Sequence, residues 1–192
     1  MNELSYATTN TGKFLSMQRA LEGIPVTQVA LDIPEPRSSD VQEIAAAKVK
    51  FAYERIQKSV IVLDGGFYIH SLNGFPRAFV NFALETIGLE GILKLIEGKD
   101  RACEFRECLA YLDDTLPEPR YFVGKVEGTI ADAPKGMMQK HLWSQLSRIF
   151  VPLDSNTTHA EMTYTEYMQR KVANVNSCTR AFATWYKDPA RK

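Results

Sequence analysis

The sequence predicts an α/β fold in which a mixed, twisted central sheet is flanked by helices. Two observations lead to this class. Over residues 1–96, short apolar segments alternate with amphipathic, helix-like segments, a pattern typical of strands connected by helices. Residues 103–130 then give two strand-like segments around a polar turn, which is typical of a β-hairpin. With 192 residues and 45% hydrophobic side chains, the chain can bury a substantial core, so we predict one domain over residues 1–192, in two lobes with a cleft between them.

The elements of the first half follow from side-chain spacing. A helix is predicted from Phe14 to Ile24, because apolar residues recur there at helical spacing and Gly23 and Pro25 end the pattern. A second helix is predicted over 41–57, with Ser39 or Asp40 as its cap. The remaining expectations are strands at 3–7, 26–31 and 60–63, extended chain at 67–69, and helices at 79–87 and 89–96.

The second half has fewer helical patterns. Residues 103–112 and 120–130 are the expected hairpin strands, and residues 113–119 form the turn between them. A loop at 134–136 precedes a short element at 142–150, and one closing helix is expected over 165–187.

Composition excludes several classes of function. Twenty-three basic and twenty-three acidic residues balance, so no electrostatic footprint for duplex nucleic acid is predicted. No apolar stretch approaches the length of a membrane span, and the first three residues do not begin a secretion signal. The cysteines Cys103, Cys108 and Cys178 lack metal-type spacing, which indicates reduced thiols in a cytoplasmic protein rather than a zinc site.

Asp64 is the first candidate catalytic residue. It follows the apolar run 60–63 and precedes Gly65 and Gly66. Ligands gather beyond the carboxyl ends of buried strands, and glycines there allow the backbone to approach a ligand closely. A carboxylate at that point is suited to catalysis. The alternative is that Asp64 only opens a turn.

A second candidate site is the turn between the first strand and the first helix. Thr8, Asn10 and Lys13 offer hydroxyl, amide and ammonium groups at a helix start, where backbone N–H groups attract anions. It is not a P-loop, because Phe14 replaces the required Ser or Thr and Ala7 replaces the first glycine. The alternative is an ordinary capped turn.

Glu43 and Lys48 are further candidates on the helix predicted over 41–57. Glu43 lies near its N-terminus and Lys48 lies five residues later. The alternative is a solvated helix face with a favourable helix-dipole interaction at Glu43.

Taken in order along the chain, these segments resemble the Ham1/inosine triphosphate pyrophosphatase family over about residues 4–150. The matching segments are Ala7-Thr8-Thr9-Asn10-Thr11-Gly12-Lys13, Glu43-Ile44-Ala45-x-x-Lys48, Val62-Leu63-Asp64-x-Gly66, Leu72-Asn73-Gly74-Phe75-Pro76, Gly88-Leu89-Glu90-Gly91-Ile92, Phe122-x-Gly124-x3-Gly128-Thr129-Ile130 and Ile149-Phe150-x-Pro152. The order is more specific than any one segment.

The resemblance implies an ITPase-like fold and a Mg²⁺-dependent attack of water on a nucleoside triphosphate, with cleavage between the α and β phosphates. By analogy, Thr8, Asn10, Lys13 and Lys48 hold phosphates, Glu43 holds the metal, and Asp64 binds metal or activates water. These types suit the chemistry, because phosphates need cations and N–H donors and Mg²⁺ needs hard oxygen ligands. The resemblance alone also implies a homodimer.

The chain departs from the family pattern at several places. Leu63 stands where an acid usually precedes the strand-end Asp, and Val175 to Arg180 replaces a Ser-His-Arg that reads the base in the family. Trp143 and Arg180 are therefore the candidates for base binding, with packing between lobes or in the core as the alternative for Trp143. We predict a pyrophosphatase for non-canonical purine triphosphates such as ITP and XTP. The alternatives are a catalytically impaired nucleotide-binding protein and a pyrophosphatase for a different nucleotide.

Overall fold

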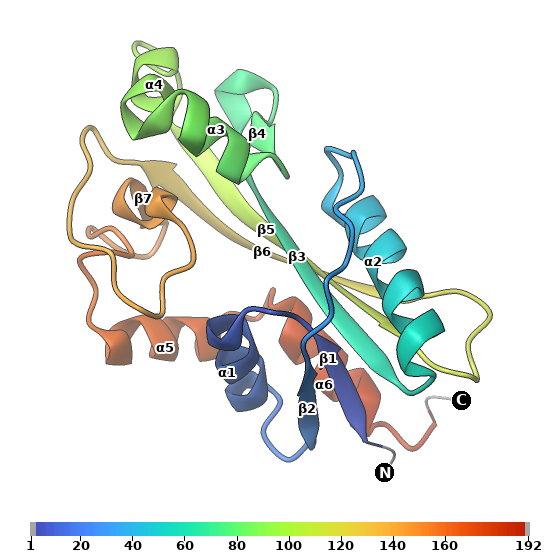
Figure 1. The fold of residues 1–192 in the computed structure, drawn as a ribbon. Helices are drawn as coiled ribbons and strands as arrows, with labels where there is room; N and C mark the ends of the chain where they lie inside the picture. Colours follow the sequence, from blue (N-terminus) through green and yellow to red (C-terminus); the bar gives the residue numbers. More distant parts are fainter. Residues whose placement is uncertain (1–2, 191–192) are drawn as a thin grey trace. The chain divides into compact units, whose positions relative to one another are not determined.

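The computed structural model describes residues 3–190, in which seven strands form one mixed sheet (Figure 1). The strand order is β2-β1-β3-β5-β6-β7, and β4 pairs with β3 outside this path. The strands are β1 (Leu4–Ala7), β2 (Val26–Val29), β3 (Val60–Ile69), β4 (Pro76–Arg77), β5 (Ala102–Leu112), β6 (Arg120–Ile130) and β7 (Phe150–Pro152). The helices are α1 (Thr11–Ala20), α2 (Val41–Ile56), α3 (Val80–Thr86), α4 (Gly88–Leu95), α5 (Tyr164–Ala173) and α6 (Cys178–Lys187), with 3-10 turns η1 (His70–Leu72) and η2 (Gln145–Arg148).

The sheet confirms the predicted α/β class. β1 runs parallel to β2 and to β3, whereas β4 runs antiparallel to β3 and β7 antiparallel to β6. β5 and β6 are neighbours, and the N–H of Ile130, which ends β6, donates to the carbonyl of Arg101, which precedes β5, at 3.0 Å. The end of one strand therefore meets the start of the other, which confirms the predicted hairpin.

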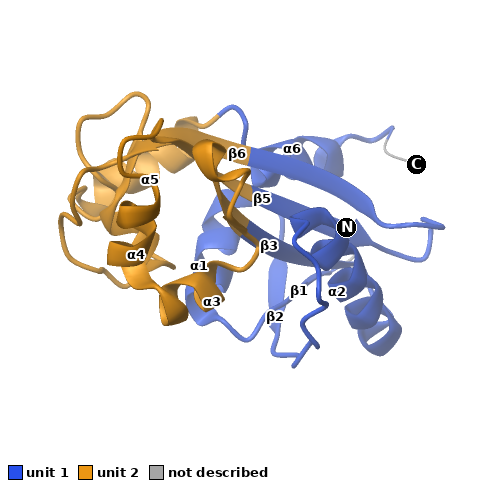
Figure 2. Cartoon of the chain, turned by 90° about the horizontal axis from the view of Figure 1, so that it is seen from above, with its two compact units in different colours: residues 1–65, 107–124, 175–192 blue, residues 66–106, 125–174 orange. Residues whose placement is uncertain are grey.

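The chain forms two compact units (Figure 2). The first unit contains Met1–Gly65, Glu107–Gly124 and Val175–Lys192, and the second contains Gly66–Arg106 and Lys125–Asn174. β3, β5 and β6 each contribute residues to both units. The single domain and the cleft between lobes stay predictions.

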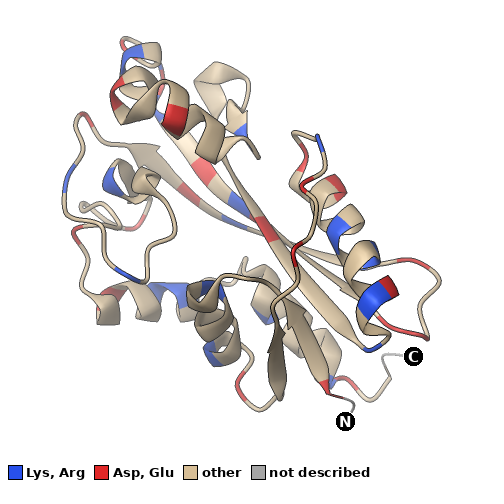
Figure 3. Cartoon of the chain, viewed as in Figure 1, with Lys and Arg blue, Asp and Glu red and all other residues tan. Residues whose placement is uncertain are grey.

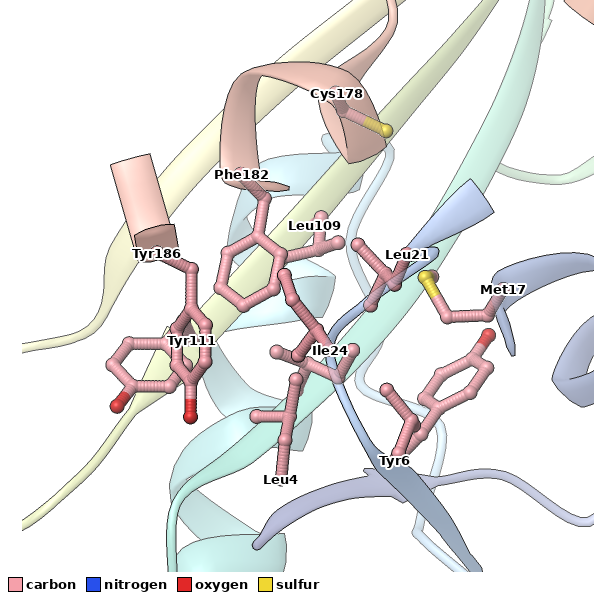
Figure 4. Packing of buried hydrophobic residues seen from close by; sticks show 12 residues of the cluster. Leu4, Tyr6, Met17, Leu21, Ile24, Leu109, Tyr111, Cys178, Phe182 and Tyr186 are labelled. Carbon is pink, nitrogen blue, oxygen red and sulfur yellow. The ribbon is translucent and has the colours of Figure 1, made fainter. Parts of the chain in front are cut away.

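In the first unit, α1 and α6 cover one face of β1 and β3 (Figure 4). Met17 and Leu21 of α1 meet Leu4 of β1 and Phe182 of α6 in one buried cluster. α1 begins at Asn10, whose Oδ1 accepts from the backbone N–H of Lys13 at 2.9 Å. The cap satisfies one of the N–H groups that a helix start leaves without an intrahelical partner.

α2 has the buried face that the sequence predicts. Asp40, rather than Ser39, is its cap, because Asp40 Oδ1 accepts from the backbone N–H of Gln42 at 2.7 Å. Its buried residues are those predicted from helical spacing: Val41, Ile44, Ala45, Val49 and Ala52. Lys, Arg and Glu residues are distributed along the length of α2 (Figure 3).

The second unit has its own core. Side chains of β3, α4, β5, β6 and η2 pack together there; the fully buried ones are Phe67, Ile69, Ile92, Ile96, Leu146, Ile149 and Phe150. α3 lies within its predicted range, α4 begins and ends one residue earlier than predicted, and η2 and β7 replace the short element expected over 142–150.

Two expectations about element ends are wrong. The strand expected to stop at Leu63 continues to Ile69, so Asp64 lies within β3 and does not open a turn. The glycines do not end the strand, because Gly66 instead allows β4 to approach: a Cβ at this position would lie 2.6 Å from the carbonyl oxygen of Arg77.

The closing helix expected over 165–187 is also two helices. Asn174 is extended (φ −62°, ψ 107°) and ends α5, and the Ser177 side chain accepts from the N–H of Arg180 at 3.4 Å to begin α6. Residues that compete with helical hydrogen bonds therefore divide the amphipathic pattern. Among residues 3–190, no helix combines the length and the apolar character that crossing a membrane requires.

Candidate active site

An ion pair between Asp64 and Lys48 is the centre of the candidate site. Asp64 Oδ2 lies 2.9 Å from Lys48 Nζ, and the two side chains are only 13% and 15% exposed. Lys48 lies on the same helix ridge as Ile44 and Ala52, both buried, so its ammonium is directed toward the sheet rather than into solvent. The alternative that Lys48 lies on a solvated face of the helix is therefore wrong.

Glu35 joins this pair. Its two carboxylate oxygens each lie 2.9 Å from Lys48 Nζ, and its side chain is exposed. Glu35 lies between Pro34 and Pro36, two residues that stiffen the segment before α2. One ammonium thus holds two carboxylates, one buried and one open to water.

Burial and charge act in opposite directions on this site. Burial raises the pKa of Asp64, and the nearby ammonium groups of Lys48 and Lys13 offset part of the rise. For Lys48, burial disfavours the charged form, but Asp64 and Glu35 outweigh it and raise its pKa. Lys48 therefore stays protonated at neutral pH. A carboxylate whose pKa is raised is a stronger proton acceptor than an exposed one.

Asp64 can take a further partner. Its Oδ2 is buried and pairs with the Lys48 ammonium at 2.9 Å. The two oxygens of a carboxylate offer about four acceptor sites, so a water or a cation can bind Asp64 in addition to the ammonium.

The turn from Thr8 to Lys13 leads into α1. Thr8 Oγ1 accepts from the backbone N–H of Asn10 at 3.2 Å, and Asn10 caps the helix. These bonds fit the capped turn that the sequence left open as an alternative. The Lys13 ammonium, in the first turn of the helix, lies near enough to Asp64 to lower the pKa of that carboxyl. The turn thus joins the Asp64–Lys48 pair through Lys13.

Glu43 is placed differently. It is exposed in the first turn of α2, and Ser38 Oγ donates to its Oε2 at 2.7 Å. Five residues along a helix are about 140° apart around its axis, so Glu43 and Lys48 project from different faces. Its predicted role as a metal ligand stays a prediction.

The two base-binding candidates belong to different units. Trp143 is in the second unit, 38% exposed, with its ring edge-on to Phe105 at a centroid distance of 5.4 Å. Arg180 is in the first unit, on the exposed side of the first turn of α6. Both roles stay predictions.

Comparisons with known proteins identify the family. The model of the Ham1 family matches residues 4–175. The chain belongs to the Ham1 family. A protein of Methanopyrus kandleri named dITP/XTP pyrophosphatase is 36% identical over 186 residues, which cover 95% of each chain. A protein of the same name from Thermococcus kodakarensis is 31% identical over 188 residues, 96% of this chain and 97% of that one.

Solved structures of Ham1 proteins share the fold. A HAM1 protein from Coxiella burnetii superposes with a TM-score of 0.81 at 23% identity and covers 96% of this chain and 98% of its own. The Staphylococcus aureus Ham1 protein gives a TM-score of 0.79 at 22% identity, with the same coverage.

Sequence reasoning missed one member of this Ham1 site. Glu35 was not among the predicted site residues, yet it shares the Lys48 ammonium with Asp64. The available signal was its place between two prolines just before the cap of α2. A stiff segment there can hold a side chain beside the helix start.

Proposed function

We propose that this chain is a nucleoside triphosphate pyrophosphatase that hydrolyses non-canonical purine triphosphates of the ITP and XTP type to the monophosphate and pyrophosphate. One observation carries the proposal: a buried carboxylate, Asp64, is paired with a protonated Lys48 and lies within the influence of Lys13. Asp64 can accept a proton from water, and the two ammonium groups can bind the phosphate oxygens of a triphosphate. The names of the Methanopyrus and Thermococcus relatives support the substrate class.

In this proposal, the cations bind the triphosphate. Lys13 and Lys48 pair with phosphate oxygens, and the α1 N-terminus with Thr8 and Asn10 adds N–H and polar donors. When phosphate oxygens take over Lys48, they compete with Asp64 and Glu35 for its three N–H donors. Substrate binding then frees Asp64 to accept a proton from the attacking water.

The residues also fit Mg²⁺. The carboxylates of Asp64 and Glu35 both contact the Lys48 ammonium and would hold the ion there, because Mg²⁺ commonly takes one or two carboxylates and completes its shell with water and substrate phosphates. Bound there, the ion would neutralise phosphate charge in the transition state. Among residues 3–190, no three acidic, His or Cys side chains converge on one point, which suits an ion shared with substrate. We therefore propose Glu35 and Asp64 as the metal ligands. Glu43, the ligand that the resemblance implies, is compared with Glu35 in the experiment below.

The remaining assignments concern the nucleobase, the cellular compartment and the oligomeric state. Trp143 would stack on the base, and Arg180 would approach its edge. Cys103, Cys108 and Cys178 are buried and form no disulfide, which suits a reducing compartment, for which we propose the cytoplasm. We also propose a homodimer, on the family resemblance alone.

The test is pyrophosphate release from ITP, XTP, GTP and ATP with and without Mg²⁺. We expect hydrolysis of ITP or XTP, and a loss of roughly a hundredfold or more in kcat for Asp64→Asn. Asp114→Asn, at an exposed turn position of the same unit, is the matched control and should keep full activity. Wild-type turnover in a folded Asp64→Asn protein would remove Asp64 from the mechanism, and no release from any triphosphate would refute the function.

The metal assignment has its own test. Glu35→Gln should raise the Mg²⁺ concentration required for half-maximal rate, whereas Glu43→Gln should leave it unchanged, because Glu43 is bound to Ser38 on another face of α2. If Glu43→Gln raises this Mg²⁺ concentration and Glu35→Gln does not, Glu43 rather than Glu35 is the metal ligand.

A further inference from the structure

Glu107 of β5 is a partly buried carboxylate without a cation. Among residues 3–190, no Lys, Arg or His forms an ion pair with it, and its hydrogen-bond contact is the Cys178 thiol, whose Sγ lies 3.9 Å from Oε2. A thiol is a weak donor. Carboxylates that are partly removed from water normally have stronger partners, so Glu107 has acceptor capacity that the folded chain does not use.

A second unsatisfied group lies beside it. The Tyr6 side chain is 1% exposed, and its hydroxyl is buried with no hydrogen bond among the residues described. Burial raises the pKa of Tyr6, and Glu107 is the charged group that raises it most, ahead of Asp64. Tyr6 and the Cys178 side chain that contacts Glu107 belong to one buried cluster, to which α1 and α6 contribute (Figure 4).

This pair adjoins the proposed phosphate-binding turn. Tyr6 is two residues before Thr8, so both side chains project from the same face of the chain, and the Thr8 hydroxyl is near enough to Tyr6 to act on its pKa. A nucleotide whose phosphates bind at Thr8 and Lys13 can place its nucleoside in this neighbourhood.

Charge decides which part Glu107 can bind. A carboxylate repels phosphate oxygens and has no proton to donate to a base carbonyl. It accepts from donors, and the donors of a nucleotide are the sugar O–H groups and the base N–H groups. Both belong to the nucleoside.

We propose that Glu107 determines nucleoside specificity by accepting a hydrogen bond from an O–H of the sugar or an N–H of the base. The proposal rests on the proposed function, since it uses the phosphate site at Thr8 and Lys13. It adds a residue of the first unit to recognition of the nucleoside, which the sequence assigned to Trp143 and Arg180.

The experiment compares ITP with analogues that each lack one donor: 2′-deoxy-ITP, 3′-deoxy-ITP and 1-methyl-ITP. Wild type and Glu107→Gln are measured for kcat/KM and, with the same four ligands, for Kd by calorimetry. Glu118→Gln is the matched control, because Glu118 is an exposed acid of the same unit that pairs with Lys50. Its values should equal those of wild type.

We expect wild type to lose roughly tenfold to a hundredfold in kcat/KM on one analogue, the range for a hydrogen bond to a charged group. Glu107→Gln should show a smaller loss on that analogue and a weaker rate on ITP. If the loss occurs on a deoxy analogue, the donor is a sugar O–H. If it occurs on 1-methyl-ITP, the donor is the base N–H.

Equal effects of Glu107→Gln on all four ligands, no effect, or only a changed Mg²⁺ requirement would each overturn the proposal. If wild type releases pyrophosphate from none of them, the proposed function fails. The Kd values then decide on Glu107 alone by the same comparison.

Discussion

The burial of His159 predicts that this protein loses stability in mild acid. The imidazole lies among aromatic rings of the second unit, with centroid distances of 4.8 Å to Phe150, 5.1 Å to Tyr167 and 6.2 Å to Phe105. Burial and, after it, the positive charge of Arg170 lower the pKa of His159 to about 4, while Asp154 opposes the shift. His141 and Lys171 also lower it.

The sign and size follow from linkage. The unfolded chain holds a histidine of pKa about 6.5, so below that pH it binds a proton that the folded protein refuses. The folded state therefore loses stability as the pH falls from about 6.5 to the folded pKa of about 4. A pKa difference of about 2.5 corresponds to roughly 3 kcal/mol.

The assay is urea unfolding at several pH values between 7.5 and 4. Carboxylates titrate in the same interval, so the informative quantity is the difference between wild type and His159→Phe, which keeps an aromatic ring and has no proton to bind. Between pH 7 and 4, wild type should lose roughly 3 kcal/mol more unfolding free energy than the variant. His70→Gln, at an exposed histidine, should follow wild type. Parallel pH curves for wild type and His159→Phe would refute the reasoning.

Three further predictions concern the first unit. Lys48→Met should lower the unfolding free energy by roughly 1–3 kcal/mol, because Asp64 is left buried without its ammonium, and should weaken triphosphate binding more than nucleoside binding; equal losses in calorimetry would contradict the phosphate role. Gly124→Ala should cost roughly 1–3 kcal/mol in urea unfolding, since a Cβ would lie 2.6 Å from the carbonyl oxygen of Asn176; an unchanged midpoint would show that the chain moves aside. Tyr6→Phe should raise the melting temperature by removing a buried, unbonded hydroxyl, and a lower value would indicate a hydrogen bond.

The elements themselves were predictable because their signals are local. Helical spacing on α2 and the alternation of apolar strands with helices depend on neighbours a few residues away, and both gave the right elements. Element ends were less predictable. Gly65 and Gly66 are typical of a turn, yet they are part of β3, because the residues after them pair with β4 and Gly66 gives the backbone of Arg77 room to approach.

The site was predictable in residue type but not in grouping. The family resemblance placed Asp64 and Lys48 in one site, but side-chain spacing could not predict that a residue of α2 forms an ion pair with one of β3. Glu35 was not chosen because its role depends on a contact 13 residues away, made across a proline-rich segment without regular spacing. Glu107 and Tyr6 carried no signal at all, since an unsatisfied group is recognisable only when its surroundings are known.

The continuity of β3 has a consequence for how the site binds its ligand. Asp64 lies on a strand that pairs with β1 and β4 on either side of it along the chain, so its backbone is already fixed before any ligand arrives. Ordering a residue's backbone costs about 1–2 kcal/mol of conformational entropy, and a carboxylate on a mobile loop would incur that loss during binding. At Asp64, folding has already imposed this loss of backbone entropy. Affinity at Asp64 is therefore diminished only by the ordering of its side chain and of the ligand.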